Sequence, residues 1–278
     1  MIRKKVNRGC FLVFIIVIAS ACQNNYSTDI QKSKDLINIG KYDEAISLLS
    51  KSISKNSVDN YEIYYYRSKA YSKIGDTKAA IKDLNKSIEL NANNSSAFND
   101  RGYCYQQEKK FNESIIDFSL AIKLSPEKYE YYNNRAFSSY SLNLYNDAYN
   151  DYSKAIALNP RYEYAYNGKG VLDQKLGKLD DAIKNFKNAI NLNNNYKEAY
   201  FNLSQTLLEI NDKENALFQL NKLIEIDSKF MKAYYLRGVL HLSIGDSSAA
   251  CNDFYVIYNK GWSDIDSLYI NVCNFSNL

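Results

Sequence analysis

Residues 95–128 read SSAFNDRGYCYQQEKKFNESIIDFSLAIKLSPEK, and the same arrangement of small, aromatic and charged residues returns every 34 residues along the chain. A small residue occupies position 8 of each repeat, at Ser68, Gly102, Ala136, Gly170, Ser204 and Gly238. A second small residue occupies position 20, at Ala80, Ser114, Ala148, Ala182, Ala216 and Ala250. A fixed period of this length is typical of a solenoid, in which each repeat packs against its neighbours.

Within each repeat the apolar residues are spaced as in two helices. Position 4 is aromatic in six repeats, and the apolar positions 4, 7–8, 11 and 20, 24, 27 follow a helical period. Gly75, Gly177 and Gly245 at position 15 mark the turn between the two helices. Pro126 and Pro160 follow the second helix, which they terminate. The small residues at positions 8 and 20 allow the helices to approach, and the aromatic residues fill the space beside them.

This pattern resembles the tetratricopeptide repeat family, as does the stretch Gly40-Lys41-Tyr42-Asp43-Glu44-Ala45, although position 4 holds Tyr or Phe rather than Trp. The resemblance implies an all-α fold, a right-handed α-solenoid of about seven helix-turn-helix repeats. Because the end of a solenoid needs a cap, we interpret the last residues as a capping helix. We expect the repeats at 26–60, 61–94, 95–128, 129–162, 163–196, 197–230 and 231–264, and the cap at 265–278.

The N-terminal residues indicate export. A basic segment with Arg3 and Arg8 precedes an apolar run at 11–18, which is shorter than the roughly 20 residues that span a bilayer. Ala19-Ser20-Ala21 before Cys22 resembles the lipobox of bacterial lipoproteins, although that family has a branched residue in place of Ala19. The resemblance implies a signal peptide at 1–21, lipidation of Cys22 and a short tether at 22–25. An ordinary secretory signal and a short uncleaved anchor are the alternatives.

The resemblance to lipoproteins also implies a location. The residue after Cys22 is Gln23 rather than Asp. By the sorting rule of enterobacterial lipoproteins, this favours a lipid-anchored protein of the bacterial cell envelope, in the outer membrane and facing the periplasm.

The charge balance argues against a nucleic-acid partner. The whole chain has 35 basic and 31 acidic side chains, a formal net charge of +4. Residues 1–21 contain four of the basic side chains and no acidic one, so a chain without them has 31 of each kind. A nucleic-acid binder needs a basic excess, so we expect no nucleic-acid partner.

The cysteines are not spaced as in a C-x-x-C motif or a zinc site. Cys104 lies on an apolar helix face, where we interpret it as a small buried residue. Cys251 and Cys273 lie in the last repeat and the tail, and in an oxidising periplasm they are candidates for a disulfide.

A charged pair also repeats. Position 7 and position 23 hold Arg67 with Asp83, Arg101 with Asp117, Arg135 with Asp151, and Arg237 with Asp253. The two positions change together, to Lys169 with Asn185 and to Leu203 with Gln219. Because the loss is coordinated, we predict an ion pair between the two helices of a repeat rather than a charged ligand site.

Nothing in the sequence indicates catalysis. The single histidine, His241, stands at position 11, where core residues lie, and one histidine makes a metal cluster or a catalytic triad difficult to assemble. No glycine-rich phosphate loop occurs. We therefore predict a protein that is not an enzyme and that needs no cofactor or metal.

The resemblance implies that the first helices line a concave groove, through positions 2, 5, 6, 9, 12 and 13. Asparagine offers both a donor and an acceptor to an extended peptide, and tyrosine offers a large rigid contact surface. Positions 2, 5 and 6 of repeats two to five hold no Lys or Arg, which argues against recognition of an acidic peptide C-terminus. The candidate partner-binding residues are Tyr65, Tyr66, Asn99, Tyr103, Asn133, Asn134, Phe137, Asn167, Asn202 and Tyr235.

We therefore expect a non-catalytic protein-interaction scaffold or adaptor that binds an extended peptide or partner protein in this groove. A glycan-binding or small-ligand-binding lipoprotein is the alternative. A continuous track of asparagines favours a peptide, whereas an aromatic platform on one repeat favours a glycan. The abundance of Tyr and Asn throughout the chain is also consistent with biased composition alone.

Overall fold

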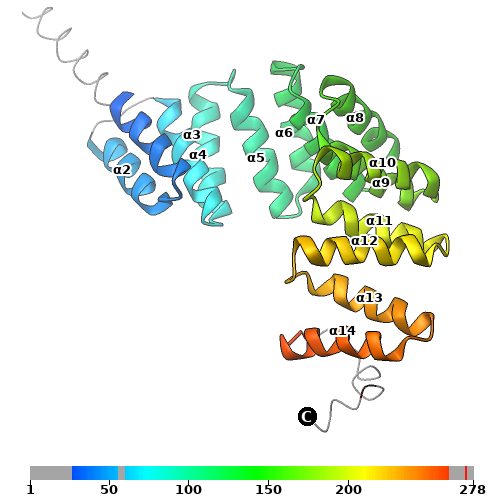
Figure 1. Cartoon of the computed structure of the whole chain (residues 1–278). Helices are drawn as coiled ribbons and strands as arrows, with labels where there is room; N and C mark the ends of the chain where they lie inside the picture. Colours follow the sequence, from blue (N-terminus) through cyan, green and yellow to red (C-terminus); the bar gives the residue numbers. More distant parts are fainter. Residues whose placement is uncertain (1–26, 56–59, 263–272, 274–278) are drawn as a thin grey trace, which may run out of the picture. The chain divides into compact units, whose positions relative to one another are not determined.

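The computed structural model describes residues 27–55, 60–262 and 273, and within these ranges the chain is all-α (Figure 1). Residues 27–38 are helical. The first helices of the following repeats are α3 (Tyr61–Lys73), α5 (Ser95–Gln107), α7 (Tyr129–Ser141), α9 (Glu163–Lys175), α11 (Lys197–Glu209) and α13 (Met231–Ser243). The second helices are α2 (Tyr42–Lys55), α4 (Thr77–Leu90), α6 (Phe111–Leu124), α8 (Tyr145–Leu158), α10 (Leu179–Leu192), α12 (Lys213–Ile226) and α14 (Ser247–Asn259).

The helices occur in pairs, as the period predicts. From α3 onward every first helix begins 34 residues after the previous one, and so does every second helix from α4 onward. The predicted signal peptide, the tether, Cys22 and the capping helix lie outside the described residues, except for Cys273. No helix in the described ranges is both long enough and apolar enough to cross a membrane.

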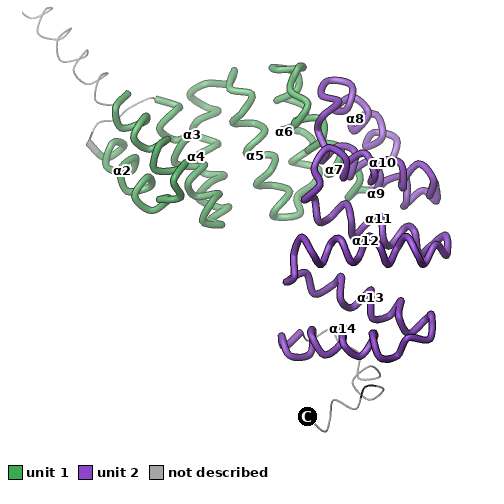
Figure 2. The backbone as a smooth tube through the Cα atoms, viewed as in Figure 1, with its two compact units in different colours: residues 1–142 green, residues 143–278 purple. Residues whose placement is uncertain are grey.

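The chain divides into two compact units, residues 1–142 and residues 143–278 (Figure 2). In the described part of unit 1, α2 packs on α3 and each later helix packs on the next as far as α7. In unit 2 the same sequential packing runs from α8 to α14. Each unit is therefore a stack of antiparallel helices in which sequence neighbours are also neighbours in space.

The turn between the helices of a repeat requires a left-handed backbone at position 15. Gly75, Gly177 and Gly245 have φ values of 82°, 73° and 85° there, which confirms the predicted turn. Other repeats place a side chain in the same conformation, at Lys109, Asn143 and Asn211. The sequence pattern did not reveal these, because L-residues rarely adopt positive φ.

Positions 8 and 24 of a repeat complement each other in volume. A Cβ atom added to Gly102 would lie 2.8 Å from Cε1 of Phe118, and one added to Gly170 would lie 2.6 Å from Cε1 of Phe186. Gly238 faces Phe254 in the same way. Glycine at position 8 thus accompanies phenylalanine at position 24, whereas the repeats with serine at position 8 have leucine at position 24, as in Ser68 with Leu84 and Ser204 with Leu220.

The predicted ion pair between the two helices of a repeat is confirmed within each unit. Arg101 donates from Nε and Nη2 to both carboxylate oxygens of Asp117, each at 2.7 Å. Arg67 with Asp83 and Arg237 with Asp253 have the same bidentate geometry. The acidic side chains are nearly buried, which suits a structural role better than a ligand site.

The same arginines also contact the preceding repeat. Nη1 of Arg67, Arg101, Arg135 and Arg237 donates to a side chain at position 25 of that repeat, to Ser50, Asn85, Ser119 and Asn221 respectively. The guanidinium groups of Arg67, Arg101 and Arg237 therefore link the two helices of their own repeat and also contact the preceding repeat, through a geometry that lysine lacks.

The fifth repeat keeps a buried carboxylate at a different position. Asp173, at position 11, is almost fully buried and accepts a hydrogen bond of 2.8 Å from Nδ2 of Asn185. Burial raises the pKa of Asp173. The change to Lys169 and Asn185 at positions 7 and 23 predicts that this repeat lacks the buried carboxylate, whereas the structure places one on the first helix, at Asp173.

Candidate partner-binding site

The first helices of unit 1 present two exposed aromatic side chains at equivalent positions. Tyr103 on α5 is 46% exposed and Phe137 on α7 is 49% exposed, and both stand at position 9 of their repeats. The ring of Phe137 contacts that of Phe111 edge-on, with the centroids 6.4 Å apart. Phe137 is thus packed against the fold, and both side chains offer apolar surface to a partner.

The predicted asparagines connect neighbouring first helices. Nδ2 of Asn134 donates to Oδ1 of Asn99 at 3.0 Å, and Nδ2 of Asn99 donates to Oδ1 of Asp100 at 3.1 Å. In unit 2, Nδ2 of Asn202 donates to Oδ1 of Asn167 at 3.0 Å. Some of the amide groups that were expected to bind a peptide therefore form hydrogen bonds between neighbouring helices instead.

Asn133 differs from the other four asparagines. Within the part of the chain that the structure describes, its partly buried side chain makes no hydrogen bond. The pairs join position 5 of one repeat to position 6 of the next, and the residue at position 6 after Asn133 is Gly168, which has no side-chain amide. Both the donor and the acceptor of Asn133 are therefore available to a partner.

Two lysines lie over the tyrosines at the N-terminal end of this face. Nζ of Lys34 is 4.6 Å from the ring centroid of Tyr66, and Nζ of Lys69 is 5.5 Å from that of Tyr65. The two rings contact each other edge-on, with the centroids 5.2 Å apart. Cation–π contacts of this kind restrict the position of the ammonium groups.

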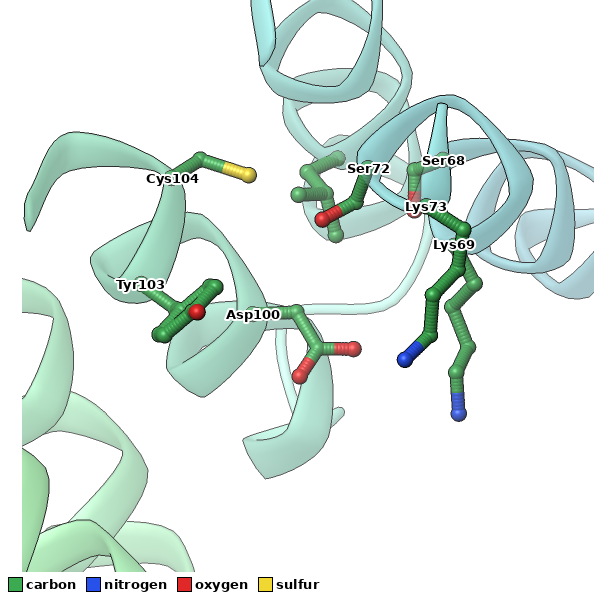
Figure 3. Close-up of a pocket in the computed structure, with 8 residues that line it drawn as sticks. Ser68, Lys69, Ser72, Lys73, Asp100, Tyr103 and Cys104 are labelled. Atoms are coloured by element: carbon green, nitrogen blue, oxygen red, sulfur yellow. The ribbon is translucent and has the colours of Figure 1, made fainter. Parts of the chain in front are cut away.

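A cavity of about 210 Å³ opens beside these tyrosines, between α3 and α5 (Figure 3). Ser68, Lys69, Ser72 and Lys73 line it from α3, and Asp100 and Tyr103 line it from α5. Burial raises the pKa of Asp100, and burial together with the nearby Asp100 carboxylate raises the pKa of Tyr65. Leu84 and Cys104 also line the cavity, so an apolar wall lies beside the lysines and Asp100.

The aromatic residues of unit 2 pack against one another at an angle. Tyr164 is 49% exposed, and its ring lies between those of Tyr162 and Tyr196, with interplanar angles of 52° and 60°. The ring of Tyr235 packs against Trp262, with the centroids 5.4 Å apart. The predicted site residue Tyr235 thus belongs to the apolar cluster at the end of the described chain, which includes Phe254.

The cysteines and the histidine offer little chemistry. Cys251 and Cys273 form a disulfide, with the Cα atoms 5.5 Å apart. Cys104 is buried, and this burial raises the pKa of its thiol to about 11, so the reactive thiolate is scarce. Nδ1 of the partly buried His241 lies 3.8 Å from Oδ2 of Asp246. Among the described residues no three His, Cys, Asp or Glu side chains are grouped to hold a metal ion.

The sequence analysis did not single out Lys34, Lys69, Lys73 or Asp100. Two of them could have been found, because Lys34 and Lys69 both stand at position 9 of successive repeats. Asp100 could not have been found in this way, because it lies near Tyr65 of a different helix as well as contacting its neighbour Asn99. The spacing of residues in the sequence does not reveal the proximity of Tyr65.

Comparisons with known proteins agree with this architecture. A family described as tetratricopeptide repeat matches residues 61–94, 95–128 and 197–230, and a family described as TPR repeat matches residues 173–211. The chain is 32% identical over 114 residues to DnaJ homolog subfamily C member 3 of Gallus gallus, a match that covers 38% of this chain and 22% of the relative. The chain thus matches about a fifth of the length of that relative.

Two solved structures are similar in fold. A tetratricopeptide repeat protein from Parabacteroides merdae has a TM-score of 0.70 at 18% identity, covering 92% of this chain and all of the other. YrrB, described as a TPR protein with an unusual peptide-binding site, has a TM-score of 0.52 at 21% identity, covering 68% of this chain and 97% of the other.

The repeats, their helix pairs and these similarities define a class of helical-repeat protein that is generally a non-catalytic interaction scaffold. The chain belongs to the tetratricopeptide repeat family. Its repeats support a role as a protein-interaction scaffold.

Proposed function

We propose that this protein is an envelope scaffold that binds an extended segment of a partner protein along the first helices of unit 1. The observation that carries the proposal is the pair of half-exposed aromatic residues, Tyr103 and Phe137, together with the amide of Asn133, which lies one helical turn before Phe137 and makes no hydrogen bond within the described residues. The aromatic rings supply apolar contact area, and the amide supplies a donor and an acceptor for a peptide backbone. YrrB, a fold relative described as having a peptide-binding site, supports the same kind of ligand by analogy.

Replacing Tyr103 and Phe137 together by alanine should weaken partner binding roughly tenfold or more, because exposed aromatic anchors contribute most of the binding energy of such surfaces. The partner is first captured by crosslinking in cells and purification from membranes, and its affinity is then measured by titration calorimetry. The helical circular dichroism signal and the unfolding midpoint should stay near those of the parent protein, since both side chains are half exposed.

Ile116→Ala is the matched control for this experiment. Ile116 is 61% exposed on the second helix α6, so its removal takes away a similar apolar surface from a different face. Partner capture that is unchanged in the Tyr103 and Phe137 variant, or equally reduced in the Ile116 variant, would contradict the proposed site.

We propose further that the chain is anchored by lipid at Cys22 and faces the periplasm from the outer membrane. Support comes from the basic and apolar leader and the small residues before Cys22. Cys22→Ser should shift the protein from the membrane fraction to the soluble periplasmic fraction and prevent incorporation of labelled palmitate. Separation of the inner and outer membranes on a sucrose gradient shows which of the two contains the protein. A Cys22→Ser protein that still fractionates with membranes as the parent does argues against the lipid anchor.

A glycan ligand is the second candidate, and the exposed ring of Tyr164 is the observation that favours it. Its neighbours Tyr162 and Tyr196 are inclined to it, so they do not extend it into a flat platform. Titration with soluble cell-wall fragments and with unstructured peptides separates the two candidates.

A further inference from the structure

The N-terminal end of the unit 1 face carries three lysines that the proposed peptide site does not use. Lys34 and Lys69 are held over Tyr66 and Tyr65, and Lys73 follows Lys69 by one helical turn on α3. Side chains four residues apart lie on the same side of a helix. We call Lys34, Tyr65, Tyr66, Lys69 and Lys73 the lysine–tyrosine surface.

Two of these ammonium groups border the cavity between α3 and α5. In Figure 3 the side chains of Lys69 and Lys73 extend in the same direction, beside the carboxylate of Asp100. Lys73 is exposed and has no ion-pair partner in the described ranges. Lys69 contacts a tyrosine ring and lies near Asp100 without forming a hydrogen bond to it in those ranges.

The carboxylate of Asp100 is already occupied. It accepts a hydrogen bond from Nδ2 of Asn99 at 3.1 Å, and the nearby Lys69 ammonium favours its charged form against the effect of burial. Asp76 follows Lys73 by three residues, and its Oδ1 accepts a hydrogen bond from the backbone N–H of Ala79 as the cap of α4. On α3 itself the acidic residue is Glu62, seven and eleven residues from Lys69 and Lys73, which corresponds to roughly 10–16 Å along the helix. At that distance a screened carboxylate neutralises the lysines only weakly.

The pair of lysines is specific to the second repeat. The later repeats have Tyr103 with Gln107, Phe137 with Ser141, Val171 with Lys175, Gln205 with Glu209, and Val239 with Ser243 at positions 9 and 13. A solvated helix face carries scattered charges, whereas here Lys34 and Lys69 are both fixed on aromatic rings at the same position of successive repeats. The surface is therefore preorganised for a negatively charged partner.

We infer that the lysine–tyrosine surface binds acidic side chains of the partner segment, with one carboxylate entering the cavity between α3 and α5. The inference rests on the proposed function and gives the chemistry of the partner. Lys69 and Lys73 supply the charge, the hydroxyl groups of Ser68 and Ser72 line the wall, and Tyr103 bounds the opening. An aspartate or glutamate next to an apolar residue fits this surface, since the exposed rings of Tyr103 and Phe137 follow along the same face.

The test uses the complete chain and a fluorescein-labelled hexaglutamate peptide with an amidated C-terminus, measured by fluorescence anisotropy at low salt. Hexaglutamine and hexalysine peptides of the same design are the comparison probes. Hexaglutamate should bind more tightly than either, and Lys69→Gln with Lys73→Gln should weaken it about five- to tenfold, since partly exposed ion pairs are individually weak. Raising the salt concentration should weaken it as well.

Lys78→Gln with Lys82→Gln is the control, because both lysines are exposed on the second helix α4. Equal binding of hexaglutamine, equal losses in the two double variants, or binding only when the peptide has a free C-terminal carboxylate would overturn the inference. Capture of the natural partner by the parent protein and its loss in the Tyr103 and Phe137 variant test the proposed function separately. The two experiments therefore distinguish the two proposals. The inference about acidic side chains can be refuted while the scaffold function is supported, and the scaffold function can be refuted while hexaglutamate binding is observed.

Discussion

Asp117→Asn should lower the free energy of unfolding of unit 1 by about 3 kcal/mol, because it leaves the guanidinium of Arg101 without its carboxylate partner. Asp117 is 2% exposed, and its two oxygens accept both hydrogen bonds from Arg101. The hydrogen bonds that Arg101 donates to Asp117 raise the pKa of Arg101 in the parent protein. A guanidinium stays charged without them, so in the variant its desolvation is not relieved by deprotonation. Urea denaturation followed by circular dichroism measures the loss.

The sixth repeat supplies a variant that should avoid most of this cost. It has Leu203 and Gln219 at the positions of Arg101 and Asp117, and replacing both members of a buried pair is often close to neutral. Arg101→Leu with Asp117→Gln should therefore be more stable than Asp117→Asn alone. Glu127→Gln, at an exposed turn position of unit 1, is the control for loss of one carboxylate. A single variant as stable as the parent would show that the pair contributes nothing to unit 1.

Gly102→Ser should destabilise unit 1 by about 1–3 kcal/mol, since an added side chain would overlap the buried ring of Phe118. The hydroxyl itself should be satisfied, because Oγ of Ser68 and Oγ of Ser204 each donate to a carbonyl oxygen of the preceding helical turn. The cost therefore comes from volume rather than from an unpaired polar group.

Adding Phe118→Leu to Gly102→Ser should recover part of the loss, because the double variant reproduces the Ser68 and Leu84 pair of the second repeat. Phe118→Leu alone leaves space and should also destabilise the unit. A double-mutant cycle on the urea midpoints measures the coupling, which we expect to be about 1 kcal/mol or more in favour of the double variant. Additive effects of the two changes would contradict the volume complementarity.

The period of 34 residues predicted most of the fold, because each position has the same neighbours in every repeat. Helix starts, the glycine turns and the arginine–aspartate pairs all follow from it. The turns at Lys109, Asn143 and Asn211 were not predicted, since no glycine marks them, although asparagine adopts positive φ more readily than most residues with a side chain. Asp173 was not predicted, because in this repeat the buried carboxylate stands at position 11 rather than at position 23. It still contacts the residue at position 23, Asn185.

The candidate site was less predictable than the fold. The repeat pattern places Asn99 and Asn134 on a common face, but it does not show that they contact each other. In the structure they are hydrogen-bonded across neighbouring helices. Pairing between position 5 of one repeat and position 6 of the next depends on the offset between adjacent helices, and the spacing of residues within a repeat does not contain that offset. This pairing is what separates Asn133 from its neighbours.

The second hydrogen bond made by each position-7 arginine joins adjacent repeats. In unit 1 that bond links every described repeat to the one before it, through Ser50, Asn85 and Ser119. In unit 2, Arg237 makes the same bond to Asn221, but Lys169 and Leu203 occupy the arginine position of the two repeats before it, where an apolar cluster from Ala182 to Leu240 joins the repeats. Directional bonds fix the register of adjacent repeats, whereas apolar contacts tolerate small slips, so the repeats that lack the arginine are joined by different means from those that have it.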